Sequence, residues 1–133
     1  MNWEDVRRHI LATFVVASDA PERIGLRWTF DGADDVQRQY VAAIVAFGRP
    51  HLQIVSNVVL ANAMPAHEAL SLNARIPIGG LCLDDGHLLL RAVLPLDGID
   101  LAVVDRALND VAHEAVQLRM QAVRKAAPAP YFE

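Results

Sequence analysis

The chain has 133 residues, a length at which a single domain buries about two thirds of the surface that its unfolded form exposes. Its 12 basic and 16 acidic side chains are mixed along the sequence and give a net charge of −4, which argues against a nucleic acid partner. The longest apolar run, residues 41–47, is far shorter than the ~20 residues of a membrane-spanning helix, and the single cysteine, Cys82, excludes an internal disulfide.

The first predicted element is an amphipathic helix over residues 3–15. Its apolar residues recur at helical spacing, Asn2 is a suitable N-cap, and acidic side chains lie in the first turn, where the helix dipole favours them. The segment SDAPER, residues 18–23, interrupts this pattern. From residue 24 to residue 30, apolar side chains alternate with polar or small ones, which predicts a strand with one buried face.

Two further strands are predicted over residues 36–47 and 52–61, both rich in β-branched residues. Short loops connect the three strands, so we expect them to form an antiparallel meander. The alternation is blurred in the second and third strands. This pattern indicates that both faces of the sheet are partly covered, one by a helix and the other by a partner.

A short helix is predicted over residues 66–74. It follows Pro65, which suits the first turn of a helix, and ends before Pro77, which disfavours helical geometry at the residue before it. A β-hairpin comes next, because Asp85 and Gly86 both tolerate the positive φ angles of a two-residue type I′ turn.

The predicted turn sets the register of this hairpin. It pairs Leu81 with Leu90 and Leu83 with Leu88 on one face. The residues that we assign to this core face are Leu81, Leu83, Leu88, Leu90, Ala92 and Leu94. The opposite face is amphipathic rather than wholly polar, so we expect it to contact a partner. The candidate partner-binding residues on it are Gly80, Cys82, Leu89 and Arg91.

Asp100 is the expected N-cap of a last helix, in which apolar residues step by three and four from Leu101 to Ala122 and form one stripe for packing on the sheet. The predicted element order is αβββαββα. This order corresponds to an α+β fold in which an antiparallel sheet is flanked by helices. We assign residues 1–125 to a single domain and residues 126–133 to a flexible C-terminal tail.

The second half of the chain resembles the bacterial YbjN-like family. The residues that carry the resemblance are Leu70, Leu72, Asn73, Arg75 and Pro77, followed by the glycine-rich strand, the Asp-Gly turn, the Leu-Arg strand and the LPLDGID segment before the last helix. The resemblance covers residues 65–122, and the first half agrees in element order. YbjN-like proteins are described as regulators, which implies a regulatory or sensory module.

The layout is also similar to that of the class I chaperones of type III secretion. These chaperones are small, usually acidic homodimers that hold an extended segment of a secreted protein against their surface. The resemblance implies that this chain dimerises and binds a polypeptide. It also implies that the short helix, through Ala69 and Leu72, helps to form the dimer interface.

No catalytic or metal-binding pattern is present in the sequence. The five histidines are scattered and none has the spacing of a zinc site such as HExxH. Asp84 and His87 should face each other beside the hairpin turn, where polar residues are expected for reasons of geometry. Cys82 lacks a histidine placed to activate it, so we interpret it as a small packing residue. Gly79 and Gly80 lack a phosphate-loop context and indicate a bulge or a close backbone approach.

The sequence therefore predicts a non-enzymatic domain without catalytic residues, metal or cofactor, which forms a homodimer and binds another polypeptide. Binding would use apolar contacts or strand addition at an exposed sheet edge. The 53% hydrophobic fraction, above the roughly 45–50% of globular chains, supports a covered surface. A lone cysteine and the lack of an apolar leader predict a cytoplasmic location. The alternative is a regulatory or sensory module that recognises a small molecule or a folded partner protein.

Overall fold

The computed structural model describes residues 1–32 and 35–126 and has an α+β fold. Its strands are β1 (Val16–Ala20), β2 (Arg23–Trp28), β3 (Gln37–Ala46), β4 (Arg49–Leu60), β5 (Gly80–Asp84) and β6 (His87–Pro95). They form one sheet in the order β1-β2-β3-β4-β6-β5, and each neighbouring pair is antiparallel. The helices are α1 (Trp3–Thr13), α2 (Ala66–Asn73) and α3 (Leu101–Ala126), with a short 3-10 helix, η1 (Ala61–Ala63), before α2.

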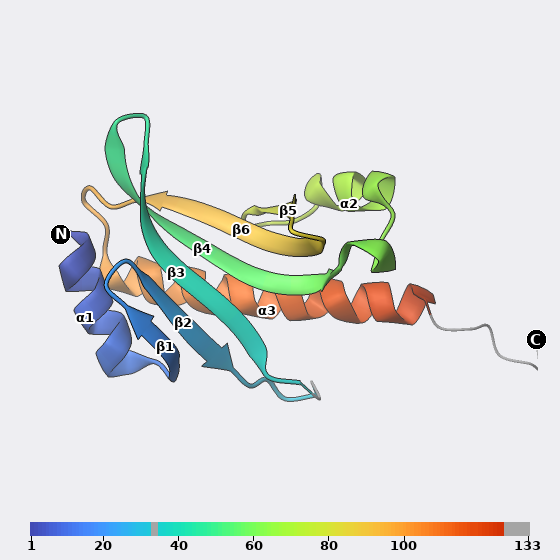
Figure 1. Ribbon diagram of the computed structural model, residues 1–133, viewed down its shortest axis with the longest axis horizontal. Helices are drawn as coiled ribbons and strands as arrows, with labels where there is room; N and C mark the ends of the chain where they lie inside the picture. Colours follow the sequence, from blue (N-terminus) through green and yellow to red (C-terminus); the bar gives the residue numbers. More distant parts are fainter. Residues whose placement is uncertain (33–34, 127–133) are drawn as a thin grey trace, which may run out of the picture.

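The long helix α3 runs along one face of the sheet, and α1 packs on the same side (Figure 1). Helix α2 lies instead beside the edge strand β5. The other face of the sheet has no helix over it in the described part of the chain. The predicted fold class, an antiparallel sheet flanked by helices, is confirmed.

The first helix has the cap that the sequence predicts. The side chain of Asn2 accepts a hydrogen bond from the backbone N–H of Asp5 at 2.9 Å, and the Asp5 carboxylate accepts one from the backbone N–H of Asn2 at 3.1 Å. Val6 and Ile10 are fully buried in the core. The helix ends at Thr13, earlier than expected, because Phe14 turns into the extended conformation and the chain continues into β1.

Strand β1 is missing from the sequence-based prediction, which placed an interruption at residues 18–23. It pairs with β2 across a register shift between Val16 and Ser18, which is typical of a bulged edge strand. All its side chains from Ala17 to Ala20 are exposed. An edge strand without a buried face has no apolar alternation, so its sequence carries no strand signal.

The predicted meander of β2, β3 and β4 is confirmed by the register of both strand pairs. The turn between β3 and β4 consists of Phe47 and Gly48, which have φ angles of 55° and 71°. This two-residue turn has the positive φ angles of type I′. Phe47 is 98% exposed at its tip.

The hairpin of β5 and β6 also has the predicted turn and register. Asp85 and Gly86 have φ angles of 48° and 75°, and β5 pairs with β6 as expected, from Gly80 opposite Arg91 to Asp84 opposite His87. The neighbouring Gly79 makes the close backbone approach that was one of two expectations, because a Cβ there would lie 2.4 Å from the carbonyl oxygen of Arg91.

The assignment of the hairpin leucines to the core is correct for β6 and partly wrong for β5. Leu88, Leu90 and Ala92 are buried. Leu81 and Leu94 are half-buried and pack against the core, whereas Leu83 is 67% exposed. The reason is that α3 packs on β4 and β6. The edge strand β5 lies beyond this helix and is contacted instead by the short α2.

Helix α3 buries the predicted stripe. Its core residues on this stripe are Val104, Leu108, Val111, Ala115, Leu118 and Ala122. The side chain of Asp100 accepts a hydrogen bond from the backbone N–H of Ala102 at 2.9 Å, as expected of an N-cap. The helix continues to Ala126. The rest of the predicted tail, residues 127–133, lies outside the described residues.

Polar side chains are fully buried between the sheet and α3. Gln39 donates a hydrogen bond to the carbonyl oxygen of Leu108 at 2.9 Å. Gln37 donates to the hydroxyl of Ser56 at 2.7 Å and accepts from the guanidinium of Arg119. Satisfied polar groups in a core favour one arrangement over others, so these bonds hold α3 at one position along the sheet. None of the helices in the described ranges is long and apolar enough to cross a bilayer.

Candidate functional site

The sheet surface opposite α1 and α3, which we call the outer face, consists of alternate residues of the strands. Cross-strand pairing forms one row of the outer face from Gly25, Tyr40, Val55, Arg91 and Gly80. A second row, displaced along each strand to the next residue on the same face, contains Arg27, Arg38, Asn57, Leu89 and Cys82.

All four candidate partner-binding residues lie on the outer face. Gly80 is paired with Arg91, and Cys82 with Leu89, as the predicted register requires. The side chain of Leu89 is half-buried and that of Arg91 is exposed. The structure therefore brings these residues together, and their role in binding a partner stays a prediction.

A first hollow of about 410 Å³ opens on this part of the outer face and is lined by Cys82, Leu89 and Arg91. The sequence-based prediction missed its other walls. These include Arg23, Tyr40, Ala42, Gln53 and Val55. The strands that contribute these residues were predicted. However, the sequence indicated the buried face only for the strand at residues 24–30. For the next two strands it did not indicate which residues point to the outer face.

Contacts inside the first hollow hold its polar side chains in place. Arg91 donates its Nε–H to the amide oxygen of Gln53 at 2.7 Å. The guanidinium carbon of Arg23 lies 3.8 Å from the centre of the Tyr40 ring, a cation–π contact. The absence of a side chain at Gly25 makes room for this arrangement, because a Cβ there would lie 3.3 Å from the Tyr40 ring.

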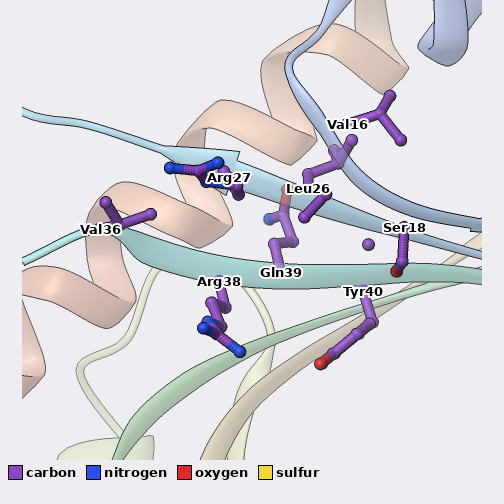
Figure 2. Close-up of a pocket in the computed structure, with 10 residues that line it drawn as sticks. Val16, Ser18, Leu26, Arg27, Val36, Arg38, Gln39 and Tyr40 are labelled. Carbon is purple, nitrogen blue, oxygen red and sulfur yellow. The ribbon is translucent and has the colours of Figure 1, made fainter.

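A second hollow of about 510 Å³ lies beside the first and shares Tyr40 with it. Ser18, Arg27 and Arg38 are among its lining residues. Figure 2 shows Ser18, Arg38 and Tyr40 on the side of the strands away from α3, whereas Gln39 points to the opposite side. Together, the two hollows extend across the outer face from β1 to β5.

The thiol of Cys82 is half-buried in the first hollow. Burial raises its pKa above the ordinary value, the positive charge of Arg91 opposes this effect, and the negative charge of Asp84 adds to it. A thiol with a raised pKa is protonated at neutral pH and is a weak nucleophile. This environment agrees with the interpretation of Cys82 as a packing residue.

An apolar groove of about 240 Å³ separates α2 from β5. Of the two predicted dimer-interface residues, Ala69 lines this groove and is only 6% exposed, whereas Leu72 is half-buried against the core and is not among the residues that line the groove. The exposed apolar side chains of the groove are Leu70, at 70%, and Leu83, at 67%. Leu70 and Leu83 are therefore the apolar groups that this edge offers to another chain.

Few side chains in the described part of the chain are placed together for acid–base or metal chemistry. It contains no cluster of three or more His, Cys, Asp or Glu side chains that would hold a metal ion. Asp84 and His87 are cross-strand partners as predicted, and the ring of His87 bonds instead to the carbonyl oxygen of Asp85 at 3.0 Å. A histidine–carboxylate contact that the sequence did not indicate joins α1 to α3, where His9 Nε2 lies 2.7 Å from Asp105 Oδ1.

Comparison with known proteins gives similarity at the level of the fold. No family model matches the chain, and no curated protein matches it, so the resemblance to the YbjN-like family stays a prediction. A solved structure described as the HopA1–SchA chaperone–effector complex contains a chain that is similar to this one, with a TM-score of 0.59 and 16% identity over 87% of this chain and 88% of that chain.

A chain in the crystal structure of the ExsC–ExsE complex is also similar, with a TM-score of 0.62 and 16% identity over 90% of this chain and 96% of that chain. Identity this low establishes a shared fold and leaves the activity to be argued from the site. The type III secretion chaperone-like fold predicted from the sequence is therefore confirmed.

Proposed function

We propose that this chain is a non-enzymatic, chaperone-like domain that binds another polypeptide on the outer face of its sheet. The observation that carries the proposal is the contrast between the two faces. Helices α1 and α3 cover one face. The outer face has no cover in the described structure, although it presents the half-buried side chains of Tyr40, Val55 and Leu89 beside two hollows. Uncovered apolar surface of this kind is typical of a binding site.

The two similar structures support the proposal at the level of the fold. One is described as a chaperone–effector complex and the other as a complex of two proteins. A fold of this kind is compatible with several functions, so the weight of the proposal rests on the outer face. We also infer a cytoplasmic location, on the sequence observations alone.

Strand addition is the second binding mode, and the two edges of the sheet differ in their suitability for it. At the β5 edge, the side chain of Asn73 accepts a hydrogen bond from the N–H of Leu81 at 2.6 Å and donates one to its carbonyl oxygen at 3.3 Å. These bonds occupy groups that a partner strand would need. The edge of β1 is therefore the one that we expect a partner strand to extend.

Homodimerisation is part of the proposal and is assigned to the groove between α2 and β5. Leu70 and Leu83 are exposed on its rim. A second copy that covered them would remove apolar surface from water, which is the main driving force of association. In this arrangement Ala69 and Leu72 support the interface from inside the protomer.

The proposal is tested by isolating the tagged protein from its own cells after brief cross-linking and identifying co-purifying chains by mass spectrometry. We expect one stoichiometric polypeptide, cross-linked to residues of the outer face. The Leu89→Asn variant should lose it, because Leu89 supplies apolar contact in the first hollow. The control Val103→Asn removes an exposed apolar side chain from α3 and should retain it.

Reproducible absence of a polypeptide in all samples would contradict the proposal. A bound metabolite in its place would favour the regulatory or sensory alternative. The two hollows, at about 410 and 510 Å³, fall within the size range of small-molecule sites, so this outcome has a place in the structure.

A further inference from the structure

A pair of like charges lies on the outer face without a carboxylate partner among the described residues. Arg27 and Arg38 are direct cross-strand partners on β2 and β3. Both are exposed, and neither guanidinium group has a hydrogen bond or ion pair with another described residue. Like charges directly opposite each other destabilise a sheet. The fold alone therefore gives no reason for this pair.

Two more arginines extend the positive charge over the same face. Arg23 lies on the Tyr40 ring, and Arg91 is held by Gln53. Neither is paired with a carboxylate in the described part of the chain, and Asp84 is the one acidic residue that the strands place on the outer face. A chain with a net charge of −4 thus gathers positive charge on its uncovered face, which is a condition for attracting a negatively charged partner.

The geometry of the face fits an extended chain that crosses the strands. Neighbouring strands are about 4.8 Å apart, which puts β2 and β6 roughly 14 Å from each other, and about four residues of extended polypeptide span this distance. Residues i and i+4 of an extended chain point to the same side. Carboxylates at these positions would reach Arg27 or Arg38 at one end and Arg91 at the other, and an apolar residue between them would meet Val55.

We propose that the outer face binds an extended polypeptide segment in which acidic and apolar residues alternate along one side, with its carboxylates held by Arg27, Arg38 and Arg91. This inference rests on the proposed function and adds the chemistry of the bound segment. Guanidinium groups suit it because their planar donors match a carboxylate in a bidentate manner.

Carboxylates fit this surface better than the phosphates of a nucleic acid. Single-stranded nucleic acids are bound by aromatic side chains on which the bases stack. Tyr40 is the one aromatic residue that the described strands place on the outer face, and the guanidinium of Arg23 already lies over its ring.

The test uses the full chain and synthetic peptides of about 12 residues, which in extended form are about three times as long as the distance from β2 to β6. The acidic probe repeats Glu-Thr-Val-Thr, and two matched probes carry Gln or Lys in place of Glu. Affinity is measured by fluorescence anisotropy. Binding at the outer face is measured as protection of Cys82, the single cysteine of the chain, from iodoacetamide.

We expect the acidic peptide to bind at least about tenfold more tightly than the Gln peptide, as charge-assisted hydrogen bonds predict, and to protect Cys82. Its affinity should fall as salt is added. The double variant Arg27→Gln/Arg38→Gln should lose this preference. The double variant Arg8→Gln/Arg106→Gln, which removes exposed arginines from α1 and α3, should keep it. The single variant Arg38→Gln serves if the double variant does not fold.

Equal binding of the acidic and Gln peptides, or unchanged binding by the Arg27→Gln/Arg38→Gln variant, would overturn the inference and leave the proposed function in place. Tighter binding and stronger Cys82 protection by an oligothymidylate would overturn it in favour of a nucleic acid. Failure of all three peptides to bind would also overturn it, whereas the proposed function is decided separately by the polypeptide recovered from cells.

Discussion

At the scale of single residues, Cys82 illustrates how neighbours set reactivity. Burial raises the pKa of its thiol, Arg91 lowers it, and Asp84 raises it. Replacing Arg91 with Gln removes a lowering influence, so the pKa should rise further. Replacing Asp84 with Asn removes a raising influence, so the pKa should fall. The midpoint of the pH dependence of iodoacetamide alkylation measures both shifts.

The matched control for these shifts is Arg106→Gln, which changes the same charge on α3 and should leave the midpoint unchanged. A midpoint that moved in the same direction in the Arg91→Gln and Asp84→Asn variants would contradict the electrostatic explanation.

Gln39 is a buried polar residue whose hydrogen bonds connect the sheet to α3. It is fully buried, donates to the carbonyl oxygen of Leu108 and accepts from the indole N–H of Trp28 at 2.9 Å. In the Gln39→Leu variant the indole N–H loses its partner. We expect the free energy of unfolding, measured in urea, to fall by about 1–3 kcal/mol.

The control for this prediction is Gln117→Leu, an exposed position on α3, where we expect a change within about 0.5 kcal/mol. Equal stability of the Gln39→Leu variant and the wild type would show that the bond to Trp28 contributes nothing to the fold.

At the scale of elements, helix α2 has an exposed apolar residue, Leu70, close in sequence to Leu72, which packs on the core. Leu70→Asp should convert the proposed dimer to monomers, because Leu70 is exposed on the groove. The thermal midpoint should fall only by the part that dimerisation contributes, which depends on protein concentration. Leu72→Asp should instead lower the thermal midpoint, since Leu72 packs on the core. Light scattering and thermal unfolding measure the two effects.

The corresponding control is Val103→Asp on α3, which also introduces a charge at an exposed valine and should leave the dimer intact. A Leu70→Asp variant that stayed dimeric at the wild-type concentration range would place the interface elsewhere.

Elements with a strong local signal could be predicted from the sequence. The cap at Asn2, the turn at Asp85 and the stripe of α3 each depend on residues close together in the chain. Strand β1 could not be predicted, because its exposed residues carry no alternation. The buried glutamines of β3 were missed for a different reason: their partners lie on α3, far away in sequence.

The same distinction applies to the candidate site. Gly80, Cys82, Leu89 and Arg91 were found together because one hairpin turn sets their register. The rest of the outer face, including Tyr40, depends on which side of β3 is covered by α3. That choice is made by tertiary packing, and a blurred alternation in the sequence does not reveal it.

At the scale of the whole molecule, the fold places two different surfaces on one sheet. Helices α1 and α3 and the buried core stabilise one face. The outer face combines half-buried apolar residues with arginines that have no carboxylate partner among the described residues. Such a surface adds little to the stability of the protomer, which is why we assign its residues to binding.

The most direct test of polypeptide binding is native mass spectrometry of the tagged protein isolated from its own cells. We expect the wild type to carry the mass of one further polypeptide in a fixed ratio, and the Leu89→Asn variant to lack it. A wild-type mass equal to that of the chain or its dimer alone, or increased only by a small metabolite, would contradict the assignment of the outer face to a polypeptide.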